Sequence, residues 1–188
     1  MFCFSRVMSS FPVSVRYPYV KQVISSFIGD YLTAINKQDL LEQYRLNPFT
    51  INVLDKRRTI LEKLVSLLRF SFSEDTQTAL AGKIRHFYDL YFLTNDNECA
   101  DYIQSSAFYG DSQELFTHDQ TEFDTPQRWT DKPISDSPLL DNFSTLWQYL
   151  RSTYQTELQP LAFIEIPDEK QIEKAFMKLI EQIKKGFI

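Results

Sequence analysis

Apolar residues recur at every third or fourth position over most of this chain, which is the spacing of amphipathic helices. Residues 56–70 show the pattern most clearly, with an apolar face made of Ile60, Leu61, Leu64, Val65, Leu67 and Leu68. Further helices are predicted over residues 19–35, 79–93, 139–158, within 96–108, and between Asp168 as N-cap and Gly186. The chain is therefore expected to be mainly helical.

Two short stretches depart from the helical pattern. Residues 11–15 (FPVSV) and 49–54 (FTINVL) alternate apolar and polar side chains, which predicts strands. Residues 110–138 are polar and hold three of the eight prolines, so we expect a long loop or lid there. This divides the chain into residues 1–109, a loop, and a helical region 139–188, packed as one compact unit. The expected fold class is α+β and predominantly helical.

Composition limits the classes of function that are open. With 188 residues, 43% apolar and 15% aromatic, the chain can bury a core and is not intrinsically disordered. Its net charge of −5 excludes a global basic field, so any contact with nucleic acid must be local. Two cysteines, Cys3 and Cys99, cannot build a disulfide framework and indicate a cytoplasmic protein. No stretch approaches the ~18 apolar residues of a membrane span.

Several common sites are missing from the sequence. The four glycines lie far apart, so there is no glycine-rich loop to bind phosphate. Two histidines and two cysteines lack the spacing of zinc ligands. The acidic stretch NDNE, residues 95–98, lacks the ligand pattern of a calcium loop and is expected to be a junction between helices. No metal ligand is therefore predicted, and Cys99 is expected to be a buried thiol.

The stretch KIRHFYDLYFL, residues 83–93, puts three polar residues among aromatic ones. Arg85 and Asp89 are four apart and can form an ion pair on one helix face, while His86 lies beside Arg85. An exposed pair of this kind contributes only about 0.3–0.5 kcal/mol, whereas a buried pair needs further partners. By the same reasoning, Glu62 and Lys63 in RTILEKL fit an ordinary solvated face. A structural role and a functional role both remain open from the residues alone.

Taken together, two phrases resemble those of a known family. NPFTINVLDKRRTILEKLVSLLR (residues 47–69) is followed by KIRHFYDLYFL, and AbiEii toxins of type IV toxin–antitoxin and abortive-infection systems carry similar phrases in this order. Members have a strand that ends in vL…RT.lEK and then a helix of the form R(D/H)xYDLY. The resemblance runs from about Val13 to the terminal helix and corresponds to the C-terminal part of a typical member.

The resemblance implies a fold, an activity and site residues. The fold is the C-terminal helical portion of a polymerase-beta-like nucleotidyltransferase, and the activity is transfer of nucleotides from an NTP to an RNA (tRNA-like) acceptor. Lys63 would bind the triphosphate, and Asp89 would orient Lys63 or act on the acceptor hydroxyl. Arg85 would pair with Asp89 or bind phosphate, and Arg58 would bind phosphate or support the Lys63 helix. The position of His86 is usually acidic or polar in the family phrase, so His86 is not expected to be catalytic.

The sequence departs from the family at the magnesium site. Members hold Mg²⁺ with an early Gly-Ser pair and an Asp-x-Asp pair, but this chain contains no Asp-x-Asp, and its first aspartate is Asp30. We therefore expect the chain to lack the N-terminal catalytic lobe. The uncovered sheet edge and apolar face that this leaves predict self-association, and the family implies a cognate antitoxin as partner.

Three hypotheses follow for function. The first is a nucleotidyltransferase of the AbiEii type without its metal-binding lobe. The second is a non-catalytic helical interaction domain, or an inert truncated remnant, of that family. The third is an unrelated helical domain in which Arg85 and Asp89 form a structural pair. Placement of Lys63 and Asp89 on opposite faces of the molecule would favour the third.

Overall fold

The computed structural model describes residues 19–161 and 165–186. These residues form two compact units, one up to Asp55 and one from Lys56 onward. The first unit contains β1 (Val20–Ile24), α1 (Phe27–Ala34), α2 (Gln38–Gln43) and β2 (Phe49–Val53). The second contains α3 (Lys56–Phe70), α4 (Thr76–Ala81), α5 (Ile84–Thr94), α6 (Asn97–Gln104), α7 (Ala107–Glu122), the 3-10 turn η1 (Ile134–Asp136), α8 (Pro138–Asp141), α9 (Phe143–Leu158), η2 (Gln159–Leu161) and α10 (Glu169–Lys185). The expected α+β, predominantly helical class is confirmed.

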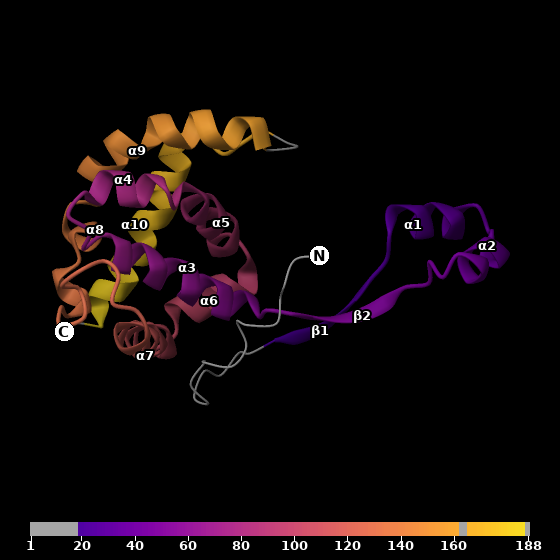
Figure 1. The fold of residues 1–188 in the computed structure, drawn as a ribbon, viewed down its shortest axis with the longest axis horizontal. Helices are drawn as coiled ribbons and strands as arrows, with labels where there is room; N and C mark the ends of the chain where they lie inside the picture. The colour runs from indigo at the N-terminus through magenta and orange to yellow at the C-terminus, as the bar shows by residue number, and fades with distance from the viewer. Residues whose placement is uncertain (1–18, 162–164, 187–188) are drawn as a thin grey trace. The chain divides into compact units, whose positions relative to one another are not determined.

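The first unit is a two-stranded antiparallel sheet with two short helices between its strands (Figure 1). The register pairs Val20 with Val53 and Ile24 with Phe49. β2 confirms the strand predicted over residues 49–54, whereas the strand predicted over 11–15 lies outside the described residues.

The helix predicted over residues 19–35 is wrong in its first half. Residues 20–24 are rich in β-branched side chains, which favour an extended backbone once a partner strand is present. The helix begins only at Phe27, because the Ser26 hydroxyl accepts a hydrogen bond from the Gly29 N–H at 3.0 Å and caps it. The polar passage that follows also contains α2, a helix that the sequence did not predict.

The second unit is built around α3, whose predicted bounds are confirmed (Figure 1). All six residues of its predicted apolar face are buried. α10 also matches its prediction: Asp168 caps it in a capping box with Gln171, and it ends before Gly186. An aromatic cluster of Phe87, Phe143, Trp147 and Phe176 joins α5, α9 and α10, with ring centroids 4.5 to 5.9 Å apart.

Two predicted helices are each divided in the structure. The helix expected over residues 79–93 becomes α4 and α5, which are separated by Gly82 and Lys83. Asp75 caps α4 by accepting the Thr78 N–H at 3.0 Å. The helix expected over residues 139–158 becomes α8 and α9, with the division at Asn142.

The loop predicted over residues 110–138 is helical in its first half. α7 buries Phe108, Leu115 and Phe116 together with the small Ser112, a face with too few apolar residues to be recognised in the sequence. Residues after Phe123 are irregular up to η1, and Trp129 is buried there against Phe116 at 5.4 Å between centroids. None of the described helices is long and apolar enough to cross a membrane.

Candidate functional site

Lys63 and Asp89 lie together although they come from different helices. The Lys63 Nζ donates a hydrogen bond to Asp89 Oδ2 at 2.6 Å, which also makes an ion pair between α3 and α5. The side chains are 23% and 39% exposed, so the pair is partly buried yet reaches solvent. Both groups are therefore accessible to solvent.

The core fixes the two helices that carry this pair. On α3, the neighbours Ile60 and Leu64 are fully buried, which leaves Lys63 at the polar edge of the helix. On α5, Phe87 and Leu90 are buried on either side of Asp89, and Phe87 packs within the aromatic cluster. Since both anchors are rigid, the contact between Lys63 and Asp89 is preorganised.

His86 lies one turn before Asp89 in a surrounding that disfavours its charged form. Burial lowers the pKa of its imidazole to about 4, and the positive charges of Lys63 and Lys83 add to this effect. Its buried Nδ1 has no hydrogen-bond partner among residues 19–161 and 165–186. The imidazole is therefore neutral at pH 7.

Replacement of His86 by glutamine is expected to reduce the loss of unfolding free energy that occurs as the pH falls. Between pH 6.5, the ordinary imidazole pKa, and about 4, the unfolded chain binds a proton that the folded chain does not, so the wild type loses stability as the pH falls. Because part of the side chain reaches solvent, we expect about 1–2 kcal/mol more loss in the wild type than in His86→Gln between pH 7 and about 4.5. Denaturant unfolding at both pH values measures this difference, and parallel losses would show that His86 is not the group responsible.

Arg85 does not form the predicted pair with Asp89. Its side chain is exposed, and within the described part of the chain no ion pair or hydrogen bond is found for its guanidinium. Asp89 pairs with Lys63 instead, because the packing of α5 on α3 brings the ammonium group within reach of the carboxylate. The structural pair required by the third hypothesis is absent from the described residues.

Comparison with known proteins supplies the family of this chain, which the geometry of the site alone does not. The model of a family described as nucleotidyl transferase AbiEii toxin, type IV TA system, matches residues 13–182. The chain belongs to the AbiEii family. No curated protein and no solved structure matches it. The match includes both phrases that carry Lys63 and Asp89.

In this AbiEii family member, Arg58 is placed to support α3. Its side chain is 3% exposed, and its Nε donates to Glu62 Oε1 at 2.7 Å, one turn further along the same helix. A guanidinium this far from solvent does not meet a phosphate without rearrangement, so the burial favours a supporting role over phosphate binding. Glu62 is only 33% exposed, so the fully solvated face considered for Glu62 and Lys63 is not what the structure shows.

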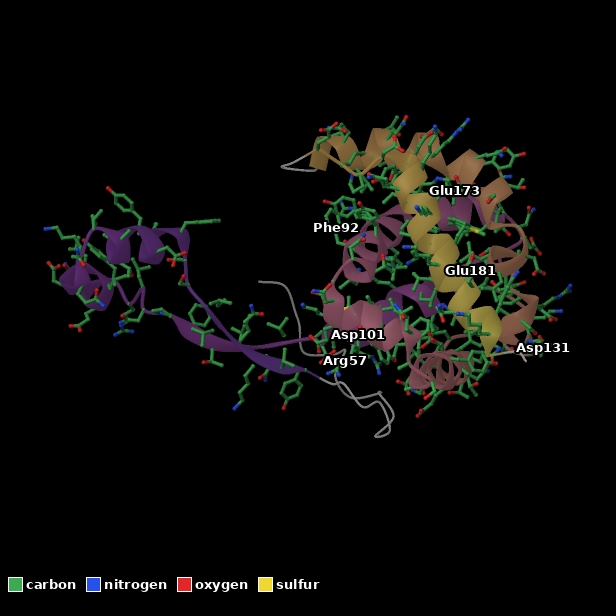
Figure 2. The ribbon with its side chains drawn as sticks, turned by 180° about the vertical axis from the view of Figure 1, so that it is seen from behind. Arg57, Phe92, Asp101, Asp131, Glu173 and Glu181 are labelled. Atoms are coloured by element: carbon green, nitrogen blue, oxygen red, sulfur yellow. The ribbon has the colours of Figure 1, made fainter. Side chains whose placement is uncertain are left out.

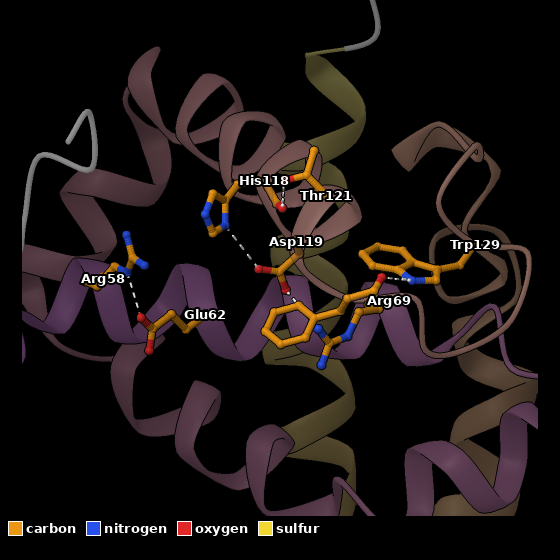
Figure 3. Close-up of polar contacts among 8 residues, drawn as sticks. Arg58, Glu62, Arg69, His118, Asp119, Thr121 and Trp129 are labelled. Atoms are coloured by element: carbon orange, nitrogen blue, oxygen red, sulfur yellow. Dashed lines mark hydrogen bonds and ion pairs between the residues drawn. The ribbon is translucent and has the colours of Figure 1, made fainter. Parts of the chain in front are cut away.

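A second polar cluster of the AbiEii chain lies between α3 and α7 (Figure 3). The Asp119 carboxylate is 3.3 Å from Arg69 Nη1 and 3.8 Å from His118 Nδ1. Burial raises the pKa of Asp119, although the charge of Arg69 opposes this shift, and burial lowers the pKa of Arg69. The Arg69 guanidinium also lies 4.3 Å from the centre of the Phe123 ring. Sequence reasoning missed this cluster because His118 and Asp119 fall in the stretch predicted as a loop.

The residues described for this AbiEii chain do not fit a magnesium site. No group of three or more His, Cys, Asp or Glu side chains is close enough to hold a metal within residues 19–161 and 165–186. Asp89, the carboxylate that the family phrase carries, is already paired with Lys63. Asp96, in the acidic stretch NDNE, caps α6 by accepting the Cys99 N–H, as expected for a helix junction. Cys99 is buried, which confirms its prediction, and burial raises its pKa to about 12.

Proposed function

We propose that this chain serves nucleotide transfer from an NTP to an RNA acceptor, with Lys63 and Asp89 as the residues that act. One observation carries the proposal: the two family phrases, 26 residues apart between these positions, bring an ammonium and a carboxylate to 2.6 Å in a place that solvent reaches. An ion pair that served only stability would not explain why both phrases match the family.

The proposal gives each group a distinct role. A lysine ammonium has three N–H donors, and the described residues engage one of them, through Asp89 Oδ2. Two donors thus remain for phosphate oxygens, where a compact cation offsets the charge that develops during transfer. Asp89 holds the ammonium in position, and its Oδ1 remains available to accept a hydrogen bond from the acceptor hydroxyl.

Magnesium and NTP are implied by the family rather than by a site in the described residues. Bound Mg²⁺ would offset phosphate charge in the nucleotidyl transfer that the family description names, but the described carboxylates do not form a site for it. The type IV toxin–antitoxin system to which the family belongs makes a cognate antitoxin the expected partner. The cytoplasm is the expected location.

A second candidate function is a non-catalytic interaction module of the same family. The observation that favours it is the lack of a carboxylate cluster for a metal among the described residues. Incubation of the purified chain with labelled NTPs, magnesium and tRNA separates the two candidates. Label incorporated into RNA supports transfer, and no incorporation under conditions where another family member is active supports the interaction module.

Self-association is a further prediction, and it rests on the first unit. Phe27 is 94% exposed and Val23 66%, and no other strand among the described residues pairs with the outer edges of β1 and β2. We expect Phe27→Ser to reduce association measured by analytical ultracentrifugation, because it removes apolar area without cutting into a core. Tyr149→Ser, which changes a 57% exposed ring on α9, is the control. A wild type that stays monomeric at high concentration would contradict the prediction.

A further inference from the structure

One face of α5 carries polar and aromatic side chains that reach solvent. Arg85, Tyr88, Asp89 and Phe92 are spaced at three and four residues, so they follow one another along a single side of the helix. We call these four residues the α5 stripe. Arg85 is exposed, Tyr88 and Asp89 are half-buried, and Phe92 is 42% exposed.

Two other rings support the Phe92 ring at one end of the stripe. Tyr88 lies at 4.9 Å between ring centroids with an interplanar angle of 60°, and Tyr91 meets Phe92 edge-on at 5.2 Å and 89°. Figure 2 shows Phe92 beside α5 at the outer edge of the second unit. The ring is thus held by its neighbours on the same helix while a large part of its surface stays open to a ligand.

The other end of the stripe carries a cation without a counter-ion in the described parts of the chain. Arg85 is one turn before Asp89, yet the Asp89 carboxylate is paired with Lys63. The distance along the helix axis from Arg85 to Phe92 is roughly 10 Å, from seven residues at 1.5 Å each. A positive group and an aromatic platform therefore lie on either side of the pair formed by Lys63 and Asp89.

We propose that the α5 stripe binds the single-stranded end of an RNA acceptor, with a base stacked on Phe92 and a backbone phosphate on Arg85. This inference rests on the proposed function, since it takes Asp89 as the residue that meets the acceptor hydroxyl. The stacked base and the neighbouring phosphate are bound on either side of Asp89. They hold the end of the RNA where its hydroxyl can reach the Asp89 carboxylate. Tyr88 supports the Phe92 ring and is a positioning residue.

The surface fits a strand end better than it fits the base of an NTP. Small-molecule ligands are mostly bound in concave pockets, whereas the α5 stripe runs along one side of a helix with Arg85 and Phe92 exposed. Aromatic rings and a local positive charge are the groups by which proteins hold single-stranded nucleic acid without reading its sequence. The net charge of −5 further limits the contact to few phosphates, which suits a strand end and not a long duplex.

Binding of a short RNA to the whole chain tests the proposal. Fluorescence anisotropy with a labelled decamer of adenosine at low salt measures Kd without any need for transfer. Because one stacked base contributes about 1–3 kcal/mol, Phe92→Leu is expected to weaken binding roughly 5- to 150-fold, and Phe92→Trp to retain it. Tyr149→Leu, at an exposed ring outside the stripe, is the matched control and should leave Kd unchanged.

Arg85→Gln provides a second, independent readout. A lost phosphate contact on a single strand makes the slope of log K against log salt shallower by about 0.7. The proposal is overturned if the wild type does not bind the decamer, if Phe92→Leu binds as the wild type does, or if a duplex of equal length competes equally. It is also overturned if Phe92→Leu weakens binding of a fluorescent ATP analogue but not of RNA. If Lys63 variants lose transfer while Phe92→Leu binds RNA as the wild type does, the proposed function stands and only this inference fails.

Discussion

Replacement of Lys63 by methionine, or of Asp89 by asparagine, is expected to lower nucleotide transfer at least about 100-fold while costing less than about 1 kcal/mol of stability. Both side chains are partly exposed, so their ion pair contributes little to the free energy of unfolding. In the proposed reaction, however, the ammonium group offsets the charge of the triphosphate. Label incorporation into RNA and denaturant unfolding, measured on the same preparations, give the two quantities.

The chain offers a matched control for this prediction. Lys56 Nζ and Asp96 Oδ2 are also 2.6 Å apart, and the pair also joins α3 to a neighbouring segment, with side chains 53% and 31% exposed. Lys56→Met removes an ion pair of the same length outside the proposed site, so transfer should stay within about twofold of the wild type. Equal losses in Lys56→Met and Lys63→Met would assign the effect to general charge and contradict the proposed role of Lys63.

Replacement of Phe87 by alanine is expected to destabilise the second unit by about 3–5 kcal/mol. The Phe87 side chain is 1% exposed, and its ring lies 4.9 Å from Phe176 and 5.4 Å from Trp147 between centroids. Its removal leaves a cavity where α5, α9 and α10 meet, and a fixed core cannot collapse fully around it. Chemical denaturation followed by circular dichroism measures the change.

The same substitution should also lower transfer, because Phe87 holds the helix on which Asp89 lies two residues away. The control for stability is Phe92→Leu, a change in a ring that is 42% exposed on the same helix, which should lower the free energy of unfolding by less than about 1 kcal/mol. Comparable destabilisation by the two variants would mean that Phe87 is not a central contact of this core. Phe87→Leu, which keeps apolar volume, should lie between them.

Where an element has a wide apolar face, the sequence predicts it well. α3 was predicted with its observed bounds, since six apolar residues mark one side of that helix. The predicted cap of α10 at Asp168 is confirmed because capping depends on neighbours within three residues, which the sequence displays directly.

Elements whose form depends on distant partners were predicted less well. β1 has apolar residues that fit either a helix or a strand, and its pairing with β2, some 25 to 33 residues away, selects the strand. α7 has a narrow apolar face, so its helical form depends on α3, against which it packs, and on the contacts of Phe116 with Phe72 and Trp129. Because that helix was missed, the polar cluster of Arg69, His118 and Asp119 was missed with it.

By itself, the sequence determined which helix carries Lys63, which carries Asp89, and that both positions match one family. It did not determine the partner of Asp89. Within one helix, Arg85 at four residues' distance is an obvious choice, and only the packing of α5 against α3 brings the Lys63 ammonium to 2.6 Å. The place of α5 in the core also depends on contacts of Phe87 with Trp147 and Phe176, which are far apart in the sequence and meet only in the folded core. Neighbours in the sequence specify which residue types a helix carries and how it is capped. The packed core specifies which of those side chains meet at a site.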